Sequence, residues 1–168
     1  NNKKVKVDIS RSEKLEFEPI MRNAIVDYSD LEDYKLLCYL LEELLVEKLR
    51  CTMQRTQPRD YYDIWYLVEV EKMEVEYFTN EFRNKCTSKE LKPEDFKNIQ
   101  NRKELFEKHY KNDLLNIIKD TLDFDFNKGS NTVESIMKKI ELITIPQKDS
   151  LGIEVKLEDH SLSNLEMD

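Results

Sequence analysis

Hydrophobic and polar positions follow a short β period at the start of this chain. Residues 5–9 alternate between apolar and polar side chains, which predicts a half-buried strand whose polar side carries Asp8. A second apolar run over residues 24–28 predicts a partner strand, reached through a polar connection that contains Pro19. Residues 1–30 are therefore expected to form a small β element.

From about Leu31 the hydrophobic period becomes helical. A row of leucines forms the broad apolar stripe of a long amphipathic helix, which we expect to end near Arg55 and to be broken near Tyr39. These leucines are Leu36, Leu37, Leu40, Leu41, Leu44, Leu45 and Leu49. Further helices are predicted over residues 59–70, 74–85 and 133–140, and residues 94–99, 105–110 and 114–122 are predicted to form one or two more. Residues 31–140 are thus expected to form one helical domain, followed over 141–168 by a late strand and a polar, acidic tail.

The composition agrees with a helical protein. The chain has 168 residues with only two glycines and four prolines, which favours a mainly α fold with a small N-terminal β element (α+β). No apolar run approaches the roughly 20 residues that cross a bilayer, so no membrane partner is expected. Cys38, Cys51 and Cys86 form neither a C-x-x-C pair nor an even set, which is typical of reduced thiols in a cytoplasmic protein.

Charge is distributed unevenly along the chain. The net charge of −8 argues against a broad surface for nucleic acid. Four cations nevertheless fall within residues 48–59, namely Lys48, Arg50, Arg55 and Arg59. This contrast favours a focused phosphate site.

The same region keeps its charges at helical spacing. Lys48 and Arg55 are seven residues apart, about two turns, so they project from nearly the same side of a helix. Asp60 and Asp63 also share a face, after a helix break at Pro58. From the residues alone, these charges either pair with one another in a helical hairpin or form a site.

This charged stretch resembles the third motif of the AbiEii-type nucleotidyltransferase toxins, which runs E-x-x-x-E-K, then R, then R-D-x-x-D. The matching positions are Glu43, Glu47, Lys48, Arg55, Arg59, Asp60 and Asp63. The resemblance extends upstream to KVKVDIS, where the family places a strand with a catalytic carboxylate, here Asp8. It continues to about residue 140.

The resemblance implies transfer of a nucleotide from a nucleoside triphosphate, with RNA as an acceptor, by a toxin that an antitoxin protein restrains. It implies that Asp8 binds Mg²⁺ and that Lys48 is catalytic. Lys48, Arg55 and Arg59 would bind phosphate, because Arg offers a bidentate fork and Lys a point charge. The remaining motif carboxylates would orient these groups or be structural; they are Glu43, Glu47, Asp60 and Asp63.

One part of the family pattern is missing. The Gly-Ser turn and D-x-D pair should precede Asp8, whereas here Asp123 and Asp125 precede Gly129–Ser130. We interpret this stretch as a helix end running into a polar turn. The chain is therefore expected to be the C-terminal helical part of a nucleotidyltransferase-like fold. On its own it should bind nucleotide weakly at most and be catalytically silent.

Two other functions are compatible with the sequence. One is a non-catalytic helical interaction module, in which the charges of Lys48 and Arg55 are neutralised by pairing. The other is a HEPN-like ribonuclease, because Arg102 and His109 have an R-x(6)-H spacing. His109 would move protons and Arg102 would hold phosphate, although this spacing arises easily on a solvated helix face.

Overall fold

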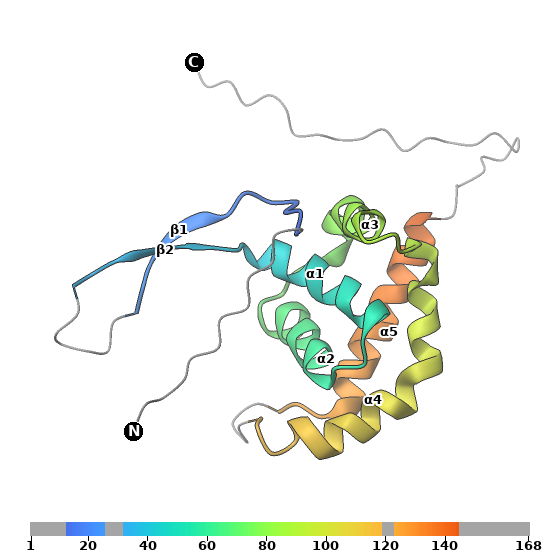
Figure 1. Ribbon diagram of the computed structural model, residues 1–168. Coiled ribbons are helices and arrows are strands. Elements are labelled where there is room, and N and C mark those ends of the chain that lie inside the picture. Colours follow the sequence, from blue (N-terminus) through green and yellow to red (C-terminus); the bar gives the residue numbers. More distant parts are fainter. Residues whose placement is uncertain (1–12, 26–31, 119–122, 145–168) are drawn as a thin grey trace, which may run out of the picture.

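The computed structural model describes residues 13–25, 32–118 and 123–144, with side chains described as far as residue 140. Within these ranges the chain forms a helical body from which a two-stranded hairpin extends (Figure 1). The predicted fold class, mainly α with a small N-terminal β element, is confirmed. The predicted strand over 5–9, with Asp8, and the predicted late strand lie outside the described residues.

The hairpin pairs β1 (Ile20–Asn23) with β2 (Lys35–Cys38) in antiparallel register, so that Met21 lies opposite Leu37. The predicted helix from about Leu31 is wrong over β2. The adjacent leucines Leu36 and Leu37 are compatible with a helix or a strand. As a strand, this segment makes its backbone hydrogen bonds with β1. Strand β1 precedes the predicted strand over 24–28, of which residues 26–28 lie outside the described residues. The Ala24 N–H still donates to the Tyr34 carbonyl oxygen at 2.9 Å.

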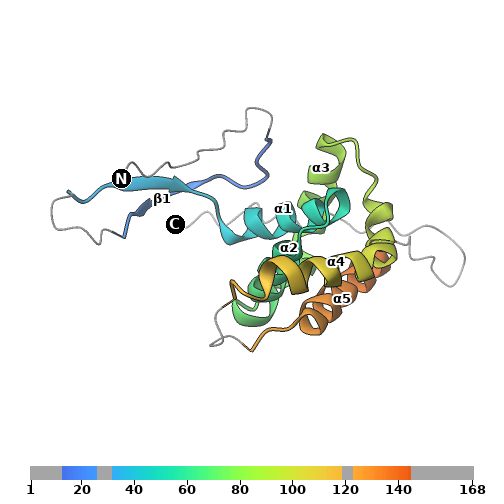
Figure 2. The same cartoon turned by 60° about the horizontal axis from the view of Figure 1, so that its bottom comes forward.

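The hairpin presents apolar side chains on both faces. Met21 and Leu37 lie on one face, Ile20 and Leu36 lie on the other, and all four are exposed. In both views the strands extend away from the helices (Figure 1 and Figure 2). A two-stranded hairpin is at best marginally stable alone, so packing of another surface against these apolar side chains would stabilise it.

Two helices joined by a short connection form the centre of the helical body. Helix α1 (Leu41–Gln54) begins after the predicted break near Tyr39 and buries Leu45, Val46 and Leu49. Pro58 then begins α2 (Pro58–Trp65), because its fixed φ suits the first helical position and its missing N–H is not needed there. Helix α2 packs against both α1 and α5 (Phe126–Thr144).

The remaining helices surround this centre. A π-helical turn η1 (Tyr66–Val70) extends α2, and a 3₁₀ turn η2 (Val75–Phe78) leads into α3 (Thr79–Ser88), which packs on α1. The 3₁₀ segment η3 (Pro93–Arg102), α4 (Lys103–His109) and the π-helical turn η4 (Tyr110–Leu114) follow. Of the stretch 114–122, predicted to be helical, residues 115–117 form a turn, and residues 119–122 lie outside the described residues. None of the described helices combines the length and apolar character needed to cross a bilayer.

Helix α5 begins earlier than the sequence pattern predicts. The Asp125 carboxylate accepts the Lys128 N–H at 2.9 Å, which is the hydrogen bond of an N-cap. The interpretation of this stretch as a helix end is therefore wrong. Gly129 lies in the first turns because a Cβ there would meet the Phe124 ring at 3.0 Å, so the helix approaches this ring closely.

Candidate functional site

Two cations of the charged motif, Lys48 and Arg55, meet at one carboxylate where α1 ends and α2 begins. Asp60 is fully buried, and its carboxylate receives two hydrogen bonds from the Arg55 guanidinium, at 2.8 and 2.9 Å. The Lys48 ammonium lies 3.3 Å from Asp60 and 2.5 Å from Asp63. We call these four residues the Asp60 cluster.

Helix geometry produces this cluster. Lys48 and Arg55 lie two turns apart and reach the same carboxylate, as their spacing predicts. The break before Pro58 turns the chain so that Asp60, in the first turn of α2, faces α1. The hydrogen bond to Asp60 raises the pKa of Arg55 above its ordinary value, and burial opposes this shift only in part.

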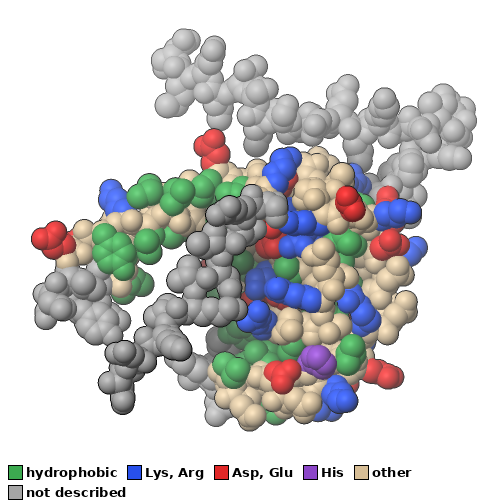
Figure 3. All heavy atoms as spheres, in the orientation of Figure 1, with side chains coloured by type: hydrophobic (Ala, Val, Ile, Leu, Met, Phe, Trp, Pro, Cys, Tyr) green, Lys and Arg blue, Asp and Glu red, His purple; other side chains and the backbone are tan. Residues whose placement is uncertain are grey.

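The Asp60 cluster leaves some positive charge accessible. The Lys48 side chain retains 17% of its exposure and that of Arg55 42%. Arg59 is exposed and makes no ion pair within the described residues. Figure 3 shows basic side chains gathered over the middle of the helical body. An anion could therefore reach this surface, although Lys48 and Arg55 are already paired with carboxylates.

Glu43 and Glu47 belong to a second cluster, built around a lysine that the sequence pattern did not single out. The Lys85 ammonium is completely buried and lies 2.5 Å from Glu43, 3.0 Å from Glu13 and 3.6 Å from Glu47. Glu47 also pairs with Arg50 on the same helix. We call Lys85 and its three glutamates the Lys85 cluster.

The position of Lys85 on the apolar face of α3 is a sequence signal that it is buried. Phe82, Lys85 and Cys86 share one face of α3, and all three are buried. A lysine at a core position needs carboxylate partners. Burial disfavours its charge, but hydrogen bonds to Glu43 and Glu13 outweigh burial and raise the pKa of Lys85.

Arg102 is engaged in structure. Its guanidinium donates to the carbonyl oxygens of Thr52 and Met53, at 2.6 and 3.0 Å, and so satisfies the C-terminal end of α1. His109 is half-buried, and its Nδ1 lies 3.9 Å from Asp113. The arginine that a HEPN-like ribonuclease would use to hold phosphate thus already serves as a helix cap.

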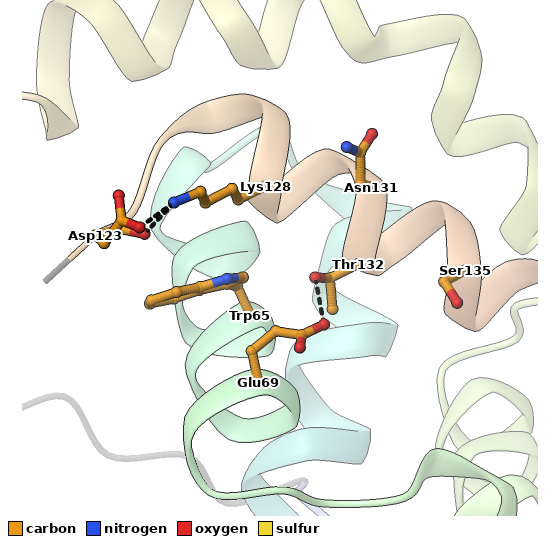
Figure 4. Close-up of a pocket in the computed structure, with 7 residues that line it drawn as sticks. All are labelled: Trp65, Glu69, Asp123, Lys128, Asn131, Thr132 and Ser135. Carbon is orange, nitrogen blue, oxygen red and sulfur yellow. Dashed lines mark hydrogen bonds and ion pairs between the residues drawn. The ribbon is translucent and has the colours of Figure 1, made fainter.

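A pocket of about 490 Å³ lies between the end of α2 and the first half of α5 (Figure 4). Lys128 points toward Asp123, at 2.5 Å, and Thr132 donates to Glu69 at 3.1 Å. Trp65 forms one wall. The cation of this pocket is therefore neutralised, and the D-x-D pair contributes a lysine partner and a helix cap instead of ligands.

The described residues do not form a metal site. No group of three or more His, Cys, Asp or Glu side chains within these ranges is arranged to hold a metal ion. Asp60, the most deeply buried carboxylate of the motif, already receives two cations. Asp8, which the resemblance assigns to Mg²⁺, lies outside the described residues.

Comparison with known proteins gives one match. A family model described as nucleotidyl transferase AbiEii toxin, type IV toxin–antitoxin system, matches residues 1–139. Neither the curated proteins nor the solved structures contain a significant match. The match covers the hairpin, both clusters and most of α5.

Proposed function

This chain belongs to the family of nucleotidyl transferase AbiEii toxins of type IV toxin–antitoxin systems, and from that premise we propose that the protein, as its gene encodes it, transfers a nucleotide from a nucleoside triphosphate to RNA. The proposal includes restraint of this activity by an antitoxin protein. The observation that carries it is the family match over residues 1–139, together with the convergence of the Asp60 cluster at the junction of α1 and α2.

Lys48 is the residue that we propose to contact the triphosphate. Its ammonium is held by Asp60 and Asp63, which fixes its position at the edge of the body without burying it fully. Asp63 is the more exposed of these two partners, so a phosphate oxygen would replace Asp63 more easily than Asp60. Arg59, exposed and unpaired within the described residues, would add a second phosphate contact.

The other motif residues support this contact. Arg55 donates two hydrogen bonds to the Asp60 carboxylate, so we assign it chiefly to holding Asp60 in place. A magnesium requirement is an expectation for this family that would depend on Asp8. The roles of Lys48, Arg55 and Arg59 do not require the ion, because the described residues do not form a site for one.

The test measures transfer of label from each of the four nucleoside triphosphates to bulk tRNA, using the protein as its gene encodes it. Lys48→Ala should lower kcat/KM by about 10- to 150-fold, the equivalent of a charged hydrogen bond worth about 1.5–3 kcal/mol. Lys97→Ala is the matched control, since Lys97 is exposed and unpaired within the described residues. Equal activity of Lys48→Ala and wild type would remove Lys48 from the site, and absence of labelled product with every nucleotide would remove the function.

We also propose that the hairpin completes a nucleotidyltransferase sheet. Its four exposed apolar side chains, Ile20, Met21, Leu36 and Leu37, lie on both faces. Strands with this pattern are typical of sheets that are covered on both sides. The hairpin would then supply two strands of that sheet next to the helical body.

A second candidate function is a non-catalytic interaction module. The observation that favours it is the mutual pairing of Lys48 and Arg55 with Asp60 and Asp63, since paired charges offer less to a phosphate. The transfer assay separates the two candidates. A module would bind an antitoxin protein equally well with Lys48→Ala and would yield no labelled RNA.

A further inference from the structure

Four side chains remain accessible on one face of α2 and the turn that follows it. All other residues of 58–67 are buried; the four are Arg59, Tyr62, Asp63 and Tyr66. Counted from Arg59, their spacing of three, four and seven residues places them within about a third of the helix circumference. The Tyr66 N–H donates to the Tyr62 carbonyl oxygen, so Tyr66 continues this face into η1. We call these four residues the α2 face.

Two tyrosine rings lie next to each other on the α2 face. The ring centroids of Tyr62 and Tyr66 are 6.3 Å apart, and the ring planes are inclined by 35°. Tyr62 also packs against the core, edge-on to Phe124 at 5.0 Å. Tyr66 contacts no second ring and makes no hydrogen bond within the described residues. The core therefore holds Tyr62, whereas packing leaves the Tyr66 ring available to a ligand.

The two rings adjoin the cations of the proposed phosphate site. The Asp63 carboxylate lies 2.5 Å from the Lys48 ammonium, and Asp63 precedes Tyr66 by three residues, about 4.5 Å along the helix axis. Arg59 precedes Tyr66 by about two turns, or about 10 Å. Burial raises the pKa of Tyr62, and the nearby Tyr66 and Asp63 raise it further. The rings and the two cations thus border the same surface.

This combination matches the chemistry of a nucleotide. Phosphate oxygens complement lysine and arginine, and every nucleobase has a π face that stacks on an aromatic side chain. The ring and the cations lie one to two helical turns apart, and a ribose joins base to phosphate in the ligand, so one molecule can contact both. The π-helical turn η1 begins at Tyr66, and such turns are frequent at functional sites.

We propose that Tyr66, supported by Tyr62, stacks on the base of the nucleoside triphosphate whose phosphates contact Lys48 and Arg59. This proposal rests on the proposed function and adds the part of the site that binds the base. Trp65 and Phe124 pack against Tyr62 and so keep the supporting ring in place. Stacking tolerates every base, so Tyr66 adds affinity without selecting one nucleotide.

The experiment compares ligands with and without a base, using the protein as its gene encodes it. Isothermal titration calorimetry gives the dissociation constants of ATP, GTP, CTP, UTP and inorganic triphosphate. Tyr66→Leu removes the π face but keeps a hydrophobic pair with Tyr62, so the fold should be retained. Tyr66→Phe keeps the ring and loses only the hydroxyl. Tyr77→Leu is the matched control, because Tyr77 is 75% exposed and lies on η2, outside the α2 face.

Tyr66→Leu should weaken the binding of all four nucleoside triphosphates by about 5- to 140-fold, the usual loss of one stacked base. It should leave the binding of inorganic triphosphate unchanged, because that ligand has no base. Tyr66→Phe and Tyr77→Leu should bind all five ligands as wild type does. Lys48→Ala should weaken all five, because each carries the phosphates that Lys48 contacts.

Two results would overturn the stacking role. One is equal weakening of nucleotides and inorganic triphosphate by Tyr66→Leu, which would mean that Tyr66 supports the phosphate contacts. The other is unchanged nucleotide binding by Tyr66→Leu; a raised KM for tRNA would then assign the stacked base to the RNA. In either case, labelled tRNA from the wild-type protein would leave the proposed function standing. Wild-type protein that binds none of the five ligands would overturn the proposed function and the stacking role together.

Discussion

At the scale of single residues, the buried carboxylate of Asp60 is compensated by two cations. Lys48 and Arg55 both pair with this one carboxylate, which is completely buried. Either cation alone can compensate the charge of Asp60. Without both, a buried carboxylate would remain uncompensated, which is far costlier than the loss of an exposed ion pair.

A double-mutant cycle tests this dependence. Lys48→Met and Arg55→Met together should lower the free energy of unfolding by about 0.5–3 kcal/mol more than the sum of the single changes, because only the double variant leaves Asp60 without a cation. Urea denaturation of the four proteins measures the coupling. In an Asp60→Asn background the coupling should vanish, and additivity in the original background would contradict the shared role of Asp60.

Lys85 offers the complementary case of a buried cation with several carboxylates. Lys85→Met should lower the free energy of unfolding by about 3–5 kcal/mol, because it leaves Glu43 buried without a cation. Lys97→Met, at an exposed position, should stay within about 0.5 kcal/mol of wild type. Chemical denaturation measures both, and equal stabilities would contradict the role of Lys85 in compensating the charge of Glu43.

At the scale of elements, hydrophobic period predicted the helical body better than its ends. The break near Tyr39, the start of α2 at Pro58 and helical structure across most of 59–110 could be read from the sequence. The strand β2 could not, because its leucines fit a helix equally well and only pairing with β1 decides the outcome. The start of α5 was missed because the sequence around Gly129 resembles a turn, whereas Asp125 caps a helix that begins at Phe126.

In the candidate site, too, the sequence predicted local arrangements but not contacts between distant segments. The spacing of Lys48, Arg55 and Asp60 predicted that they share a face, and they meet in the structure. The partnership of Glu43 with Lys85 joins helices forty-two residues apart. No local pattern reports such a contact, and only the burial of a lysine on an apolar face hints at it.

The cap of α5 gives a prediction at this scale. Asp125→Ala should lower the free energy of unfolding by about 0.5–2 kcal/mol, because it removes the acceptor for the Lys128 N–H. Asp123→Ala removes only an exposed ion pair with Lys128 and should cost less than about 1 kcal/mol. Thermal or urea unfolding of the two variants measures the difference, and equal effects would contradict the assignment of Asp125 as the cap.

At the scale of the whole molecule, an acidic chain keeps its buried charges in compensated clusters. Burial alone would raise the pKa of Glu13, but hydrogen bonds from Lys85 and Lys89 outweigh it and lower this pKa from 4.5 to about 2. Hydrogen bonds from lysines likewise lower the pKa of Glu76 and Glu134. The folded state therefore binds fewer protons at these carboxylates than the unfolded chain does.

The sign of the pH dependence follows from these lowered pKa values. The contribution of Glu13 to stability is complete above about pH 4.5 and is lost as the pH falls toward about 2. Wild-type stability should therefore decline steeply over this range, and more gently in Glu13→Gln, which has no carboxylate to protonate. Urea midpoints between pH 2 and 7 measure both slopes, and parallel curves would mean that Glu13 keeps an ordinary pKa.

The three cysteines differ in burial, so their alkylation reports whether the hairpin is exposed. Cys51 and Cys86 are buried, and burial raises their pKa to about 11 and about 12, so their thiolates are scarce near neutral pH. Cys38 lies on β2 and is only partly buried. Brief alkylation should therefore mark Cys38 first, as peptide mass analysis would detect. Slower alkylation of Cys38 in the protein as its gene encodes it would show that another surface lies against the hairpin.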